Sequence, residues 1–151
     1  MYNIVKEAHS VIAYIVKEAH SGIAYLVLIA LVIAVINAII GATSKKEFTK
    51  KDRTISLVAF ILTHIQLLAG LILYFVSPLG LGQLGNMKDS AMRLTSMEHP
   101  LINIIAIVLI TMGWSQHKKA ADDKKFGKIA LFYGIGLVLV LSRIPYGSWF
   151  A

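Results

Sequence analysis

The residues of this sequence with the clearest chemical potential are histidines within apolar segments. His20, His64 and His99 each lie in or beside a different long apolar stretch. Ionisable side chains inside a membrane are costly, so such residues are candidates for function. A b-type haem needs neutral imidazoles on facing helices of a bundle. Arg143, near the end of the last apolar stretch, can offer a cation to a haem propionate. These four residues form the candidate cofactor-binding set, with the three histidines as candidate ligands of the haem iron.

The depth of each side chain can be compared by counting helical residues from the lysine-rich loops. At a rise of 1.5 Å per residue, His64 lies about 16 Å deep, Arg143 about 22 Å, His99 about 24 Å and His20 about 30 Å. His20 and His99 therefore match in depth better than His64 and His99 do. We expect function in the half of the bundle away from the lysines.

Other interpretations stay open for the same residues. The histidines can be packing groups that hydrogen-bond across helices and bind nothing. Glu98 and His99 can form a proton relay, or together with His20 a metal site. Arg93 and Glu98 can be a simple interfacial ion pair. His117, in contrast, falls in a polar stretch and is expected to be solvated.

Four long apolar stretches must position these side chains. The chain is 57% hydrophobic and 15% charged, with a mean hydropathy of +0.72, which is too apolar for a soluble domain of this size. We predict an all-α fold, a single membrane domain that forms a four-transmembrane-helix bundle with up-down topology. Asp89 or Ser90 can cap the third helix, which then holds Pro100 inside it. Gly134 and Gly136 can allow close helix approach. The predicted helices cover about residues 13–40, 54–76, 90–115 and 126–144.

Basic residues are concentrated in two of the predicted loops. Residues 42–53 carry four lysines and one arginine, and residues 115–128 carry five lysines. The positive-inside rule places both loops in the cytoplasm and both termini on the outer, periplasmic side of a bacterial inner membrane. Membrane orientation accounts for the net charge of +7, and no nucleic-acid partner is expected.

An 11-residue segment is repeated at the N-terminus: IVKEAHSVIAY at Ile4–Tyr14 is followed directly by IVKEAHSGIAY at Ile15–Tyr25. Eleven residues are close to three helical turns, so His9 and His20 share one face of a continuous helix. One interpretation is a long first helix with two equivalent histidines. The other treats residues 1–14 as an extra copy, from a duplication or a sequence-assignment error, outside the bundle. The second is favoured because the helix is long enough to span without the first copy.

Several classes of site are excluded or unsupported. The chain has no cysteine, which excludes disulfides, iron–sulfur clusters and thiolate zinc sites. It has no nucleophile elbow, phosphate loop or paired-carboxylate motif. Whether it is an enzyme is uncertain from sequence, and a subunit or electron carrier fits better than a stand-alone enzyme.

Segments spread along the chain resemble a known family. They are THIQLLAGLILYFVSP (Thr63–Pro78), SMEH (Ser96–His99), IIAIVLITMGWSQHKKA (Ile104–Ala120) and AHSGIAYLVLIAL (Ala19–Leu31). Together they resemble the small four-helix, cytochrome b-like integral membrane proteins of Bacteroidetes-type bacteria, over nearly the whole chain after the first repeat copy. The resemblance implies a histidine in each of the first three helices, and His20, His64 and His99 match those positions. The chain departs from the pattern in the extra copy with His9 and in Pro100 directly after His99.

Two functional hypotheses follow. The first is a b-type cytochrome-like membrane subunit that holds haem b by intramembrane histidines and takes part in electron transfer. The alternative is a non-catalytic accessory or structural subunit of a larger inner-membrane complex. Both place the chain in a lipid bilayer, within a larger membrane complex or a homo-oligomer.

Overall fold

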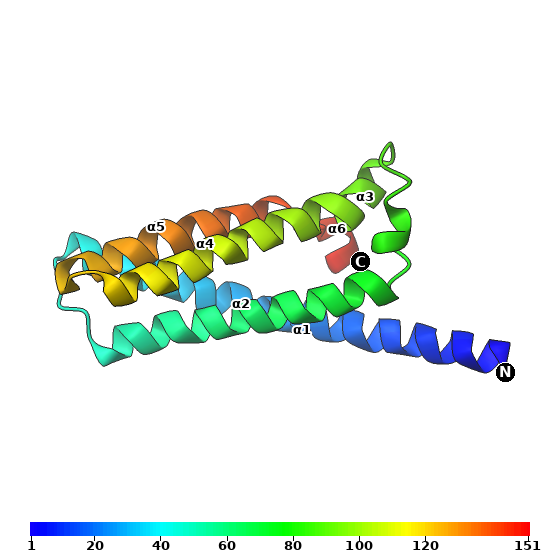
Figure 1. The fold of residues 1–151 in the computed structure, drawn as a ribbon, viewed down its shortest axis with the longest axis horizontal. Helices are drawn as coiled ribbons and strands as arrows, with labels where there is room; N and C mark the ends of the chain where they lie inside the picture. The colour runs from blue at the N-terminus through cyan, green and yellow to red at the C-terminus, as the bar shows by residue number, and fades with distance from the viewer.

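The computed structural model describes residues 1–151, which form helices and connections with no strand. Figure 1 shows the chain running back and forth along one long axis. The connections that carry the lysines lie at one end, called here the lysine end, and both termini lie toward the other, called the terminal end. The long helices are α1 (Tyr2–Thr43), α2 (Lys50–Val76), α4 (His99–Lys119) and α5 (Asp122–Ser142).

The chain has four helices long and apolar enough to cross a membrane, with Ser90–Lys119 counting as one helix. This confirms the predicted all-α class and indicates a multi-pass membrane protein. Only 22 of the 151 residues are buried, and large aliphatic side chains cover the outer faces of all four long helices. Such a surface would be unfavourable in water and is suited to lipid, where it needs no polar cover.

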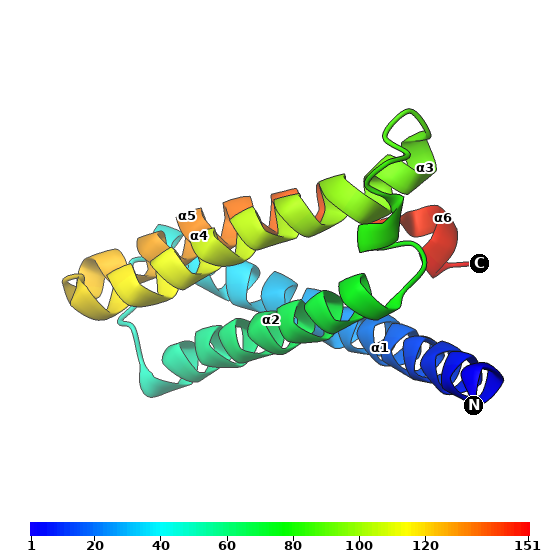
Figure 2. The same ribbon diagram turned by 45° about the vertical axis from the view of Figure 1, so that its right-hand side comes forward.

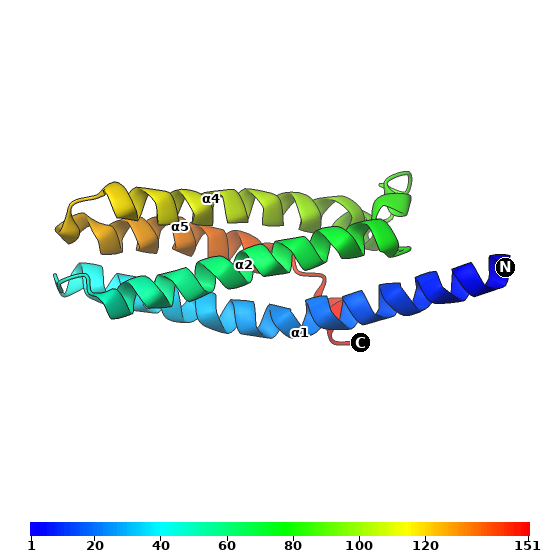
Figure 3. The same ribbon diagram turned by 60° about the horizontal axis from the view of Figure 1, so that its bottom comes forward.

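The helices pack in a ring in which α1 contacts α2 and α5, and α4 contacts α5 and α2. Figure 3 shows the α4–α5 pair above the α1–α2 pair. The α2–α4 contact is the least extensive of the four. The core cluster is centred on Leu31, Ala34, Ile110, Ile129 and Tyr133. The bundle is therefore closed tightly around α5 and more loosely between α2 and α4.

The first helix is longer than predicted and begins at Tyr2. Nothing in the repeated segment breaks a helix, so both copies form one continuous rod. Figures 1 and 2 show its N-terminal turns extending past the rest of the bundle. His9 is exposed there, whereas His20 lies within the bundle. The first copy is thus helical but outside the packed core.

The third span starts where its capping residue predicts. Asp89 accepts hydrogen bonds from the backbone N–H groups of Ala91 and Met92, which begins α3 (Ser90–Arg93). A π-helical turn, η2 (Leu94–Glu98), then leads directly into α4. Pro100 cannot donate to the carbonyl four residues before it, that of Ser96. The Tyr74 hydroxyl of α2 donates to that carbonyl at 3.0 Å, so the proline leaves no unpaired acceptor.

The α1–α2 connection is closed by a buried carboxylate. Asp52 is 4% exposed and forms a capping box with Thr49 at the start of α2. One carboxylate oxygen accepts from the Thr49 backbone and hydroxyl, and the other accepts from the Asn37 amide of α1 at 2.9 Å. Both oxygens are paired, which is what allows a charged group to be buried here.

Of the two glycines expected to permit close approach, only one does so. A Cβ built on Gly136 of α5 would lie 2.8 Å from Ile110 Cγ1 and 3.2 Å from the Ala106 carbonyl oxygen of α4. A Cβ on Gly134 would meet nothing closer than Val35 at 4.0 Å. The α4–α5 contact therefore depends on Gly136.

We expect Gly136→Ala to destabilise the bundle by about 1–3 kcal/mol, the usual cost of overpacking a close contact. Gly134→Ala, its matched control on the same helix, gains helix propensity and should be neutral or slightly stabilising. Thermal unfolding in detergent measures both. Equal midpoints for the two variants would contradict the α4–α5 contact described here.

Candidate functional site

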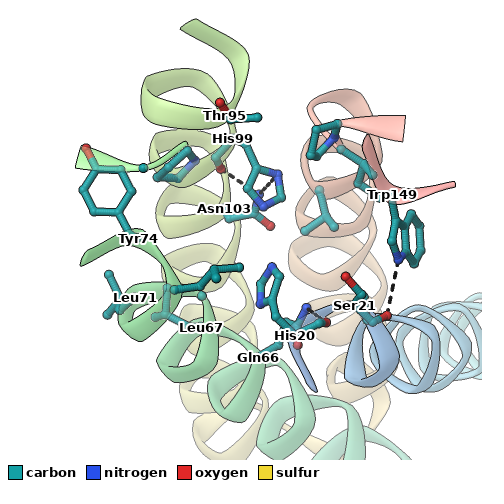
Figure 4. Close-up of a pocket in the computed structure, with 18 of the residues that line it drawn as sticks. His20, Ser21, Gln66, Leu67, Leu71, Tyr74, Thr95, His99, Asn103 and Trp149 are labelled. Carbon is teal, nitrogen blue, oxygen red and sulfur yellow. Dashed lines mark hydrogen bonds between the residues drawn. The ribbon is translucent and has the colours of Figure 1, made fainter. Parts of the chain in front are cut away.

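A cavity of about 260 Å³ lies between the helices toward the terminal end. It is lined by α1, α2, α4, the end of α5 and the short helix α6 (Tyr146–Trp149). Figure 4 shows the imidazoles of His20 and His99 directed into it from opposite sides. Their ring centroids are 6.2 Å apart and their planes are perpendicular. Two of the three predicted histidines therefore meet, and they are the pair that depth along the helices favours.

The surroundings of the His99 ring favour one tautomer. Its Nδ1 lies 2.8 Å from the carbonyl oxygen of Arg143 and 3.2 Å from the Asn103 amide nitrogen. The carbonyl contact is the shorter and a carbonyl only accepts, so we expect Nδ1 to carry the hydrogen in the neutral ring. The Asn103 amide, one turn along α4, donates to the His99 carbonyl at 2.7 Å. The Nε2 lone pair of His99 is thereby left for another group. This is the usual arrangement of a metal-binding histidine, whose other nitrogen is held by an outer acceptor.

The His20 ring is packed against a glycine. A Cβ on Gly70 of α2 would lie 3.0 Å from His20 Cε1, so a side chain at residue 70 would crowd the imidazole. The Gln66 amide donates to the His20 carbonyl at 2.9 Å. His20 Nδ1 and Gln66 Oε1 are both buried without a partner. The imidazole nitrogen can donate and the amide oxygen accepts, so the cavity wall holds two complementary polar atoms without partners.

His64, the third candidate ligand, has both ring nitrogens engaged outside the cavity. Nδ1 lies 2.7 Å from the Phe60 carbonyl, and Nε2 lies 3.1 Å from the Thr111 hydroxyl of α4. The structure therefore supports the cross-helix packing interpretation for this histidine.

Arg143 reaches the site through its backbone and not through its guanidinium. Its carbonyl holds His99, while its Nε lies 3.3 Å from a Glu98 oxygen. Arg93 binds the other Glu98 oxygen at 2.8 Å, so the expected Arg93–Glu98 ion pair exists and includes a second arginine. The cation that lines the cavity is Lys17 of α1.

Two further expectations are settled by the side-chain positions. No group of three or more His, Asp or Glu side chains is placed to hold a metal ion, so His20, His99 and Glu98 do not form the three-ligand site considered above.

His117 is not solvated, because it lies in the last turn of α4 and is 2% exposed. Its ring packs against Trp114 and Phe48. The expectation was wrong because the helix continues to Lys119, past the end of the apolar stretch.

The C-terminal segment covers one side of the cavity. Trp149 of α6 donates from Nε1 to the Ser21 carbonyl at 3.3 Å, and its ring lies against Tyr25 with centroids 4.6 Å apart. The sequence indicated an interfacial anchor at this tryptophan but not its contact with α1. It also gave no role to Asn103, whose only local signal is its spacing of four residues from His99.

Comparison with protein-family models, curated proteins and solved structures gives no significant match. The cytochrome b-like resemblance of the sequence therefore stays a prediction.

The hydrogen bonds predict the tautomers of two histidines. In detergent-solubilised protein with ¹⁵N-labelled histidine, His99 and His64 should both give the Nδ1–H form by NMR, since each Nδ1 faces a backbone carbonyl. Exposed His9 serves as the control and should show no such constraint. An Nε2–H tautomer at His99 would contradict the site geometry.

Proposed function

We propose that this protein is a multi-pass membrane b-type cytochrome-like subunit that binds haem b between α1 and α4 and takes part in electron transfer. The observation that carries the proposal is the meeting of His20 and His99 in one cavity, 6.2 Å apart by ring centroids. His64 was an equal candidate ligand in the sequence, but here it serves as a packing group between α2 and α4.

The spacing of the two rings would let both histidines hold one haem iron. An imidazole nitrogen bonds a first-row metal at about 2 Å, and the 6.2 Å between the ring centroids would leave room for one iron between the rings. The donor set fits as well, because neutral histidine is a common axial ligand of haem iron. The Nδ1 contact of His99 to the Arg143 carbonyl would orient that ring.

The surroundings supply the other requirements of a haem pocket. Of the 27 residues that line the cavity, 13 are hydrophobic, and these favour contact with a flat apolar ring. The cavity is slightly smaller than the roughly 300–1,000 Å³ typical of ligand pockets. A macrocycle would need more room, which the α2–α4 contact, the least extensive of the four, would have to provide. Lys17 lines the same cavity and is better placed than the Glu98-bound Arg143 to pair with a propionate.

Bound in this pocket, haem would supply a one-electron redox centre. The chain's own residues have three tasks. His20 and His99 bind and orient it, Gly70 keeps α2 close to the His20 ring, and Trp149 covers the side facing α1.

The proposal predicts which histidines matter. After expression with ample haem, purified protein should give a b-type reduced-minus-oxidised spectrum. His20→Ala or His99→Ala should lower bound haem at least tenfold, because each removes one of the two imidazoles that would hold it. His64→Ala and His9→Ala, the matched controls, should keep it. Absence of a b-type band in the folded parent protein would refute the proposal, and so would equal losses at all four positions.

The orientation that accompanies this function is also proposed. The lysine end would face the cytoplasm of a bacterial inner membrane, and the haem would lie toward the periplasmic leaflet with both termini outside. The support is the concentration of basic residues in the α1–α2 and α4–α5 connections.

The second candidate is an accessory subunit of a larger membrane complex, favoured by the N-terminal part of α1. Residues 2–12 are all exposed, and Ile4, Val5, Val11 and Ile12 are each more than 50% exposed on a part of α1 that no other element covers. An apolar helical surface extending past the bundle is suited to contact with another protein.

This candidate makes a different prediction. Deleting residues 2–14 should leave the bundle folded, because those residues contribute nothing to the core. Co-purification of larger membrane partners should be lost, while a His20→Ala/His99→Ala variant retains it. Migration of the full chain alone on native detergent gels would refute the subunit role.

A further inference from the structure

A second candidate site, independent of the proposed haem pocket, lies at the lysine end between α2 and α4. Two cations from different helices converge there on one indole ring. Arg53 Cζ of α2 is 5.8 Å from the Trp114 ring centroid, and Lys118 Nζ of α4 is 5.6 Å from it. The guanidinium and the ammonium therefore lie no farther apart than the sum of these two distances.

Neither cation has a carboxylate partner. The ion pairs at this end join Lys124 to Asp123 and Lys125 to Asp122. The buried Asp52 is occupied by Thr49 and Asn37. Residues 42–56 and 115–128 together hold ten lysine and arginine side chains against four carboxylates. Two like charges held near one ring repel each other, and an anion between them would remove that cost.

The indole that joins the two cations is held firmly. Trp114 is 8% exposed, stacks on Phe60 of α2 and packs against His117. It lies one turn before the end of α4, the level at which tryptophan prefers the headgroup region of a bilayer. The apolar outer faces of α2 and α4 continue from this point toward the terminal end.

We propose that Arg53, Trp114 and Lys118 form a binding site for the phosphate of an anionic phospholipid headgroup. The planar guanidinium can bind two phosphate oxygens, and the lysine adds a point charge. The acyl chains would lie along the loose α2–α4 contact. Basic pockets between transmembrane helices are known to bind anionic headgroups in this way. The lipid would also link α2 to α4, the helix pair with the least extensive contact in the ring.

The test compares two double variants of equal charge. Arg53→Gln/Lys118→Gln removes the proposed site. Lys51→Gln/Lys119→Gln removes one cation from the first turn of α2 and one from the last turn of α4, next to the same residues. All four side chains are exposed, so both variants should fold, and Arg53→Lys serves as a milder third variant. Phosphatidylglycerol is titrated into protein in neutral detergent, and bound lipid is counted by native mass spectrometry, with phosphatidylcholine as reference.

The site variant should bind phosphatidylglycerol at least tenfold more weakly, since each cation near a lipid surface contributes roughly fivefold in affinity. The control variant and phosphatidylcholine binding should change little, and Arg53→Lys should lose part of the effect. Equal losses of phosphatidylglycerol binding in the two double variants would show that general surface charge accounts for the binding, and would overturn the proposal. Displacement of the lipid by an equal concentration of inorganic phosphate would assign the site to free phosphate and also overturn it.

Discussion

The constraint on which this structure depends is that polar groups in an apolar bundle must find partners within the protein. Lipid offers no hydrogen bonds, so each backbone group left free costs several kcal/mol. The chain meets this cost by directing side chains to free carbonyls. Tyr74 donates to the carbonyl that Pro100 leaves unpaired, and His99 donates to the carbonyl of Arg143, just past the end of α5. The His99–Arg143 contact also favours one tautomer of His99, a candidate haem ligand. The need to pair a backbone carbonyl therefore influences the geometry of the site.

Both ends of the bundle keep some buried polar atoms unpaired. At the lysine end the Asp52 carboxylate is paired by its capping box and by the Asn37 amide, while His117 Nδ1 is buried without a partner. At the terminal end His20 Nδ1 and Gln66 Oε1 stay unpaired while buried. Buried polar atoms without partners are rare in folded proteins and mark places where something else is expected. The two unpaired atoms at the terminal end belong to residues that line the cavity between His20 and His99, which supports the proposal of a ligand there.

The α2–α4 contact connects the two proposals made for this protein. It is the least extensive helix contact in the ring. It borders the histidine cavity at one end and the Arg53–Trp114–Lys118 cluster at the other. Between them, the His64–Thr111 hydrogen bond and the Phe60–Trp114 stack are its main side-chain links. A contact held by a few polar and aromatic pairs can open for a ligand more readily than the α4–α5 contact, where Gly136 lets the backbones meet.

The sequence alone determined the features that depend on local chemistry. The length of the apolar stretches predicted the four long helices, and Asp89 predicted the start of the third span. Counting the helical rise per residue put His20 and His99 at similar depths. Only the tertiary structure decided that His64 is engaged elsewhere, that Arg143 offers its carbonyl, that His117 is buried and that Gly136 is the close contact. The physical reason is that core and lipid are both apolar. The pattern of a membrane helix therefore does not reveal which face turns inward, and that rotation decides which side chains meet.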